Sequence, residues 1–231
     1  MVKKKKLVIY GLGETADIAY EYFTHDSIYD VVAFTVDKEH LINEIHYAIP
    51  VIDFKLIDKI FPPHEVEMFV AASYNKLNRV RAKMYHAAKA KSYVCANYIS
   101  SRAFVWHNVK LGDNLMIFEN VVVQHSAEIG NNIIMWTGSI VAHQTKIEDH
   151  VFLATNVVIS GFCLIGEFSF LGANCTLIDN IKLGKNNLVG SGALIIKNSQ
   201  KDELLIGVPA QSAVKKSYQA FNMNHDYVTF L

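Results

Sequence analysis

The sequence predicts an α/β unit, about half of a dinucleotide-binding domain, followed by a parallel β-helix of about five coils. Two observations carry this prediction. Every sixth residue from Val105 to Ile195 is aliphatic or methionine, and a glycine-rich turn at Gly11-Leu12-Gly13 lies between an apolar run and an expected helix. We therefore expect residues 1–100 to form the α/β unit, residues 101–211 the β-helix and residues 212–231 a C-terminal tail.

Composition sets the broad class of the protein. The chain has 231 residues, of which 51% are hydrophobic and 19% charged, and this is enough to bury a core. Lys plus Arg and Asp plus Glu both number 22, so no net charge favours a nucleic acid or an anionic membrane as a partner. No apolar run reaches the roughly 18 residues of a membrane span. The three cysteines form neither a disulfide framework nor a CxxC metal pair, so we expect a soluble cytoplasmic protein without a metal site.

The first hundred residues alternate between strand and helix patterns. The expected elements are a strand at 7–10, a helix at 16–23, a strand at 31–36, a helix near 52–60, a strand at 67–72, a helix at 77–90 and a strand at 93–95. This order predicts about four parallel strands. The turn from Gly11 to Ala16 would point backbone N–H groups at an anion, and Asp37 ends the second strand. The pattern fits a dinucleotide site and a sugar-nucleotide site equally well.

A period of six is found neither in an α-helix nor in a simple strand alternation. The sixteen residues that define it are Val105, Leu111, Ile117, Val123, Ile129, Met135, Val141, Ile147, Leu153, Ile159, Ile165, Leu171, Leu177, Leu183, Val189 and Ile195. The position four residues later is small or aliphatic nearly throughout and includes Cys163 and Cys175, which we expect to fill the core. Gly and Asn recur where a tight corner needs them. Three hexads then close one triangular coil, and neighbouring coils stack about 4.8 Å apart.

Residues eighteen apart stack in successive coils, and one corner carries possible chemistry. Its column reads His107, His125, His143, Gly161, Asp179 and Lys197. Acyl transfer to an amine or hydroxyl needs a base, and imidazole suits that task near neutral pH. A glycine at 161 would let the backbone approach a ligand, with its N–H directed at a developing negative charge. From the residues alone, the histidines could equally be solvated corner residues.

The repeats, the glycine-rich N-terminal unit and the closing Gly207-Val208-Pro209-Ala210 resemble hexapeptide-repeat acyltransferases. Within that group the chain is similar to sugar acyltransferases of the sialic acid O-acetyltransferase and bacillosamine N-acetyltransferase type. The resemblance implies left-handed coils, against the usual right-handed crossover rule. It also implies direct transfer of an acyl group, most simply from acetyl-CoA, to a nucleotide-linked amino sugar. A homotrimer with active sites between subunits is the implied assembly.

The resemblance also assigns candidate site residues. His143 is the implied general base and Gly161 the implied oxyanion donor, with His125 and His150 as further catalytic candidates. The residues expected to bind the nucleotide-linked sugar are Gly11, Gly13, Glu14, Thr15 and Asp37. Those expected to bind acyl-CoA are Gly161, Ala173, Gly190, Gly192 and Lys197. Aromatic residues at outward repeat positions suggest a subunit interface, namely Phe118, Trp136, Phe162 and Phe168.

Two departures from the resembled pattern matter. Gln144 follows His143 where many relatives carry an acid, so a supporting carboxylate would have to come from Glu119, Glu128 or Asp149. The N-terminal loop has Glu14-Thr15 where relatives often have His or Ser.

Four alternatives stay open at this point. They are a sugar O-acetyltransferase of the same fold, a γ-type carbonic anhydrase, an NAD-dependent oxidoreductase and a non-catalytic scaffold. A γ-type carbonic anhydrase would need a His-x4-His zinc pair, but position 148 is Glu. The nucleotide, the sugar and the length of the acyl chain are not determined by the sequence.

Overall fold

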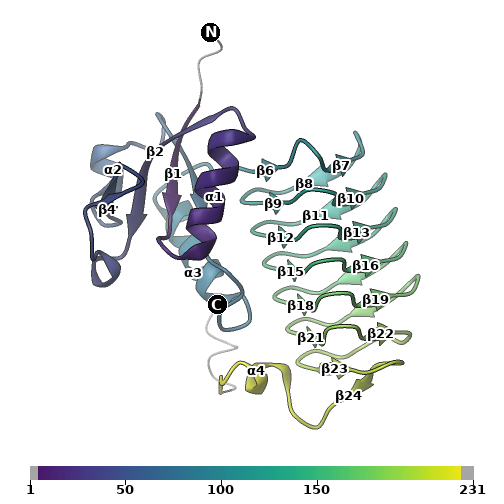
Figure 1. Cartoon of the computed structure of the whole chain (residues 1–231). Helices are drawn as coiled ribbons and strands as arrows, with labels where there is room; N and C mark the ends of the chain where they lie inside the picture. The colour runs from purple at the N-terminus through teal and green to yellow at the C-terminus, as the bar shows by residue number, and fades with distance from the viewer. Residues whose placement is uncertain (1–4, 225–231) are drawn as a thin grey trace.

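The computed structural model describes residues 5–224, and its N-terminal part is an α/β unit with one sheet (Figure 1). The strand order is β3-β4-β2-β1-β5, in which β4, β2, β1 and β5 are parallel and β3 is antiparallel to β4. The elements are β1 (Lys5–Tyr10), α1 (Glu14–His25), β2 (Tyr29–Val36), the 3-10 helix η1 (Lys38–His40), β3 (Ile45–His46), β4 (Ile49–Asp53), α2 (Ile57–Ile60), β5 (Glu67–Val70) and α3 (Arg79–Ala90).

Helices α1 and α3 cover opposite faces of this sheet, because alternate residues of a strand point to opposite sides. On β1, Leu7 and Ile9 belong to the apolar cluster that includes α1. Val8 and Tyr10 belong to the cluster that includes α3. The glycine-rich turn therefore lies at the carboxyl end of a central, buried strand.

The prediction of a helix near residues 52–60 is wrong for the first half of this range. Ile49–Asp53 is strand β4, and only Ile57–Ile60 is helical. An apolar run of this length fits a strand or a helix, and pairing of Val51 beside Phe34 of β2 favours the strand. The expected strand at 93–95 contributes only a bridge between Met68 and Cys95, so β4 is the fourth parallel strand in its place.

The remaining chain winds into three sheets of two- or three-residue strands, each sheet forming one face of a triangular prism. The β6 face contains β6 (Tyr98–Ile99), β9 (Met116–Ile117), β12 (Ile134–Met135), β15 (Phe152–Leu153), β18 (Phe170–Leu171), β21 (Leu188–Val189), β23 (Leu204–Ile206) and the antiparallel β24 (Gln211–Ser212). The β7 face contains β7 (Phe104–Val105), β10 (Val122–Val123), β13 (Ile140–Val141), β16 (Val158–Ile159), β19 (Thr176–Leu177) and β22 (Leu194–Ile195). The β8 face contains β8 (Lys110–Leu111), β11 (Glu128–Ile129), β14 (Lys146–Ile147), β17 (Leu164–Ile165) and β20 (Lys182–Leu183). A short helix, α4 (Ser217–Ala220), follows.

The predicted hexad register is confirmed strand by strand. Each aliphatic residue pairs with its counterpart eighteen residues later, as Val123 does with Val141 and Val141 with Ile159. Corner asparagines take the left-handed conformation that ordinary side chains avoid, with φ between +54° and +64° at Asn114, Asn120, Asn132, Asn156, Asn174, Asn180 and Asn186. Cys163 and Cys175 are buried in the core, as expected. The predicted fold class, an α/β unit followed by a left-handed β-helix, is confirmed.

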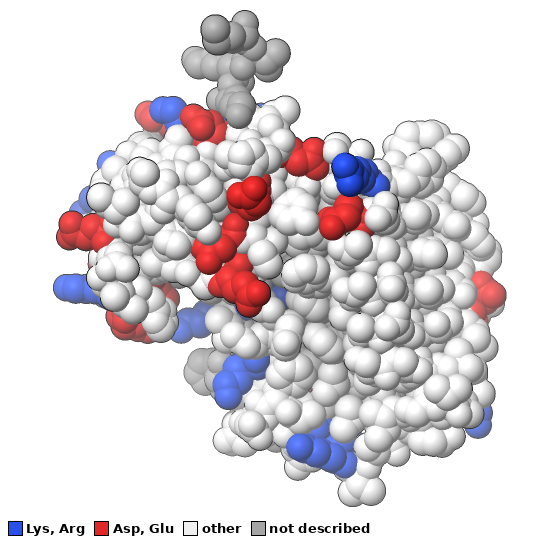
Figure 2. Space-filling view, in the orientation of Figure 1, with Lys and Arg blue, Asp and Glu red and all other residues white. Residues whose placement is uncertain are grey.

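The outward residues of the three faces differ in kind. On the β6 face Met116, Ile134 and Phe152 are buried in one cluster with α1 and β1, so the α/β unit covers this face. The β8 face exposes charged residues such as Lys110 and Lys182. The β7 face exposes a column that is apolar but for one threonine: Phe104, Val122, Ile140, Val158, Thr176 and Leu194. Figure 2 shows that the side of the β-helix turned to the viewer carries almost no charged side chain.

Helix α3 is fixed to the β-helix by a buried arginine. The Arg81 side chain is fully buried and donates hydrogen bonds to the backbone oxygens of Asn132, His150 and Val151. Burial lowers the pKa of Arg81 to about 9, which still leaves the guanidinium charged at neutral pH. Because a buried charge is costly unless its donors are satisfied, these carbonyl contacts hold α3 at one position along the coils.

Candidate active site

The corner between the β7 and β8 faces, here called the histidine corner, holds two stacked imidazoles. The rings of His125 and His143 lie 5.5 Å apart at an angle of 13°, one coil above the other. The Phe162 ring meets His143 edge-on at 5.0 Å. Phe162 is half exposed, so the His143 ring lies at the rim of the β-helix, where a substrate can reach it.

Gly161 gives the His143 ring the space it occupies. A Cβ atom at Gly161 would lie 2.5 Å from Cε1 and 2.9 Å from Nε2 of His143, closer than a non-bonded contact allows. The φ angle of Gly161 is not in the left-handed region, so the glycine is needed for close approach and not for backbone shape. The structure thus brings together two of the residues that the sequence assigned to catalysis.

The backbone N–H of Gly161, expected to meet an oxyanion, already has an acceptor. It donates to Oδ1 of Asp179, one coil further along the same corner, at 2.8 Å. A thioester oxygen can take this hydrogen bond only after the Asp179 carboxylate turns aside.

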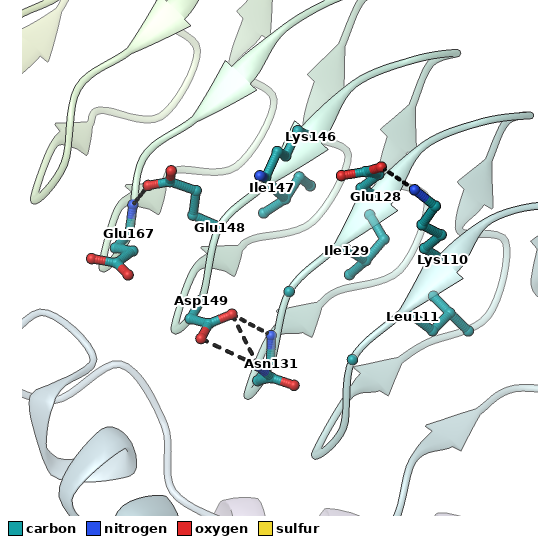
Figure 3. A pocket seen from close by; sticks show the side chains of 12 residues that line it. Lys110, Leu111, Glu128, Ile129, Asn131, Lys146, Ile147, Glu148, Asp149 and Glu167 are labelled. Atoms are coloured by element: carbon teal, nitrogen blue, oxygen red, sulfur yellow. Dashed lines mark hydrogen bonds and ion pairs between the residues drawn. The ribbon is translucent and has the colours of Figure 1, made fainter.

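The three carboxylates considered as partners of His143 are engaged elsewhere. Glu119 accepts a hydrogen bond from Tyr22, Glu128 pairs with Lys110 at 2.6 Å, and Asp149 bonds Asn131. Figure 3 shows the last two pairs in a groove of about 410 Å³ on the β8 face. Within residues 5–224, none of the three hydrogen-bonds the His143 ring.

His150 does not join this site. It lies at the corner between the β8 and β6 faces, is 4% exposed, and receives a hydrogen bond from Asn132 on Nδ1 at 2.9 Å. Burial, together with the nearby positive charge of Arg81, lowers the pKa of His150 to about 3 and keeps the ring neutral. Of the two roles left open for His150, the capping of a corner under α3 is the one that this geometry favours.

The residues expected to bind acyl-CoA lie on two different corners. Gly161 and Lys197 follow β16 and β22 and belong to the histidine corner. Ala173, Gly190 and Gly192 follow β18 and β21 and belong to the corner between the β6 and β7 faces. One chain therefore does not gather them into a single groove.

The residues expected to bind the nucleotide-linked sugar do come together. A cavity of about 760 Å³ at the carboxyl end of β1 is lined by all five of them: Gly11, Gly13, Glu14, Thr15 and Asp37. A Cβ at Gly11 would lie 2.4 Å from the backbone oxygen of Ala71, so glycine is required there, whereas Gly13 has open space around its Cα. Asp37 accepts a hydrogen bond from Tyr10 at 3.0 Å, and burial with this carboxylate raises the pKa of Tyr10.

The cavity has an acidic rim. Glu14, Asp37 and Glu39 line it, and Lys83 of α3 is the only lysine or arginine among the described residues that does so. Glu14 also lies in the first turn of α1, where it opposes the attraction of the helix N-terminus for an anion. Lys83 is thus the permanently cationic side chain of this described lining that a phosphate group could meet. It could not be singled out from the sequence, because α3 carries several basic residues without a distinguishing pattern.

Trp136 is one of the four aromatic residues expected at a subunit interface. It belongs to the β-helix but lines the cavity, with its ring stacked on Phe118 at 4.4 Å. Phe118 is buried under the α/β unit, and Phe168 lies 4.1 Å beneath the guanidinium of Arg79. The prediction that Phe118 and Phe168 face another subunit is therefore wrong, because the α/β unit of the same chain covers them, whereas Trp136 remains partly exposed in the cavity wall.

Two kinds of feature are absent from residues 5–224. No group of three or more His, Cys, Asp and Glu side chains is arranged to hold a metal ion. No helix is both long and apolar enough to cross a membrane.

The fold of this chain is similar to that of solved sugar N-acetyltransferases over nearly its whole length. Perosamine N-acetyltransferase PerB from Caulobacter crescentus, solved with CoA and GDP-perosamine, is 25% identical, with 90% of this chain and 97% of that chain covered and a TM-score of 0.78. The acetyltransferase domain of PglB from Neisseria gonorrhoeae, solved with acetyl coenzyme A, is 21% identical, with 91% and 100% covered and a TM-score of 0.80.

A third structure, WeeI from Acinetobacter baumannii, is 19% identical, with 91% and 100% covered and a TM-score of 0.75. No protein-family model and no curated protein sequence matches the chain. The resemblance to hexapeptide-repeat sugar acyltransferases is confirmed by the solved structures, since the likeness covers the α/β unit as well as the β-helix.

Proposed function

We propose that this chain is a CoA-dependent N-acyltransferase that transfers an acyl group, most simply acetyl, to the amine of a nucleotide-linked sugar. One observation carries the proposal. A cavity at a glycine-rich turn and a solvent-reachable histidine packed on a bare glycine occur in one chain, in a fold whose solved examples hold CoA with GDP-perosamine, or acetyl-CoA.

The proposed chemistry is direct transfer. The sugar nitrogen attacks the thioester carbon while His143 takes a proton from that nitrogen. Asp179 releases the Gly161 N–H, which then donates to the oxygen of the tetrahedral intermediate. The C–S bond breaks, and the proton held by His143 goes to the departing CoA sulfur, so that N-acyl sugar and CoA thiol are the products.

A covalent acyl-cysteine is not part of the proposal. Cys163 and Cys175 are both buried, and burial raises the pKa of both thiols, that of Cys175 to about 12. A thiol that stays protonated and has no access to the substrate is a poor nucleophile. A ternary complex of enzyme, acyl-CoA and acceptor therefore fits the chain better.

The proposed active site lies between subunits. The histidine corner joins the β7 and β8 faces, so it is the edge of the prism opposite the β6 face, on which the α/β unit and its cavity lie. A sugar held in the cavity of one chain is thus on the wrong side of the β-helix to meet its own His143. The cavity of one subunit must instead face the histidine corner of its neighbour.

The β7 face is the proposed contact between subunits in a homotrimer. Its outward column is mainly apolar and includes Phe104, of which 52% is exposed, with Trp106 beside it at 43%. Exposed apolar area of this kind is typical of an interface. This contact also brings the histidine corner, at one edge of the β7 face, toward the adjoining chain.

The test is thiol release from acetyl-CoA with a panel of UDP-, dTDP- and GDP-linked amino sugars. Wild type should turn over one of them, and His143→Ala should lower kcat by roughly 10²-fold or more, because this variant lacks the proposed general base. His125→Ala, which removes the stacked neighbouring ring, is the matched control and should retain most of the activity. Absence of acetyl-CoA binding in wild type would contradict the proposal.

The acceptor group of the sugar is the part of the proposal that a simple comparison of substrates can change. The same histidine could deprotonate a sugar hydroxyl, so turnover of neutral nucleotide sugars alone would convert the assignment to O-acylation.

The proposed compartment is a reducing cytoplasm, which suits a chain whose three cysteines are all unpaired.

A further inference from the structure

The loop that follows β5 lines the cavity and carries unusual backbone strain. Ser73, Tyr74 and Asn75 contribute to the cavity wall. The next three residues, Lys76, Leu77 and Asn78, all have positive φ angles of +54°, +50° and +67°. A run of three left-handed residues without glycine is unfavourable by itself, so other contacts must hold it.

Part of the support for this strained turn comes from the β-helix. The Leu77 side chain is fully buried. The Asn78 side chain donates hydrogen bonds to the backbone oxygens of Phe168 and Ser169, each at 3.2 Å. These contacts fix the end of the turn where α3 begins, and the N–H of Asn78 donates a hydrogen bond to the backbone oxygen of Tyr74 at 3.0 Å.

The C-terminal segment adds contacts of its own to this region. After β24 the chain returns beneath the last coil to the side of the α/β unit, where α4 lies (Figure 1). The buried Ser217 donates from Oγ to the backbone oxygen of Asn186 and from its N–H to that of Asp202, at 3.2 Å for the latter. Asn186 Oδ1 in turn accepts a hydrogen bond from Arg79 at 2.7 Å, so α3, the last coils and α4 meet at one residue.

Beyond this anchor, Phe221 reaches the cavity wall through an aromatic cluster. Its ring lies 6.3 Å from that of Tyr74 and 6.1 Å from that of Phe170. Tyr74 also packs edge-on against Phe152 at 5.0 Å and Phe170 at 4.9 Å. Three rings from two distant parts of the chain thus surround a tyrosine that lines the cavity.

We propose that the C-terminal segment, residues 217–224, is a clamp on the nucleotide-sugar cavity, and that Phe221 is a positioning residue which acts through Tyr74. This inference takes the identity of the ligand, a nucleotide-linked sugar, from the function proposed above. The clamp itself follows from the strained turn, the buried Ser217 anchor and the aromatic cluster, none of which involves the histidine corner.

The experiment compares Phe221→Ala with Phe221→Tyr, which keeps the ring, and with Val214→Ser, a change at a fully exposed residue just before this segment. Hydrogen exchange of peptides covering residues 73–80 reports on the turn without any ligand. Calorimetric titration with GDP, UDP, dTDP and CoA reports on the two binding sites. Hydrogen exchange of residues 73–80 should become faster in Phe221→Ala alone. In that variant the affinity for the nucleotide that wild type binds most tightly should fall about three- to tenfold, as expected for lost aromatic contacts.

Affinity for CoA should stay within about twofold in all variants, since CoA is assigned to other corners of the β-helix. Unchanged exchange in Phe221→Ala would overturn the clamp, and so would an equal loss of CoA and nucleotide affinity, which indicates general loosening. Wild type that binds CoA but none of the three nucleotides would overturn the proposed sugar-nucleotide function, while the exchange data would still decide on the clamp.

Discussion

At the scale of single residues, Gly161 determines the geometry of the candidate site in two ways. Its missing side chain admits the His143 ring, and its N–H is directed outward at the same corner, where Asp179 accepts it. A residue that is small for steric reasons and also offers a backbone donor suits a reaction in which a base and an oxyanion must lie close together.

Replacement of Gly161 by alanine should displace the catalytic ring without unfolding the protein. The added Cβ would fall 2.5 Å from His143 Cε1, while the φ angle at 161 tolerates a side chain. We expect kcat to fall about 10- to 100-fold, since a misplacement of 1 Å costs that much in oriented catalysis. Steady-state kinetics beside a melting curve will check this, with Ser160→Ala as the control. A variant with normal kcat would show that His143 need not be held where it lies.

The sequence could predict that His143 and Gly161 share a corner and that the residues of the glycine-rich turn and Asp37 come together, because each stands in a motif with fixed spacing. Trp136 and Tyr74 could not be predicted in this way. The hexad period indicates that Trp136 points out of the β-helix, but it does not indicate that the α/β unit of the same chain covers that face. His150 likewise has the spacing of a corner residue, and only the docking of α3 reveals that it is buried.

At the scale of elements, each strand of the β-helix has one inward and one outward residue, and the three faces share the inward pattern while differing in the outward one. The hexad period predicted the inward column and therefore the fold. The outward residues of one face recur every eighteen residues. They are apolar from Val122 to Val158 on the β7 face and largely charged on the β8 face. This longer period was present in the sequence and identifies a free apolar face.

A charge on the β7 face should disrupt the proposed subunit contact. Ile140→Glu would bury a carboxylate between subunits, at a cost of several kcal/mol. We expect light scattering to report monomers and thiol release to be lost, while circular dichroism stays native. Lys182→Glu, at the equivalent outward position of the β8 face, is the control and should remain assembled and active. An Ile140→Glu protein that assembles like wild type would exclude the β7 face as the interface.

At the scale of the whole molecule, one chain carries two candidate half-sites on opposite sides of the β-helix. The cavity at the glycine-rich turn lies with the α/β unit on the β6 face, and His143 lies on the edge that the β7 and β8 faces share. The C-terminal clamp borders only the first of these half-sites. Assembly would therefore complete the active site, and a monomer should bind a nucleotide without acylating a sugar.

The most direct test of this account is complementation between two inactive variants. His143→Ala removes the base, and Gly13→Leu fills the cavity, since the space around Gly13 is open. Each variant alone should be inactive in thiol release from acetyl-CoA with the best nucleotide-linked amino sugar. When the two are unfolded together and refolded as mixed trimers, about a quarter of the active sites should combine an intact histidine with an intact cavity from its neighbour, and activity should recover to that level. Mixtures that stay inactive, although mixed trimers form, would contradict an active site shared between subunits.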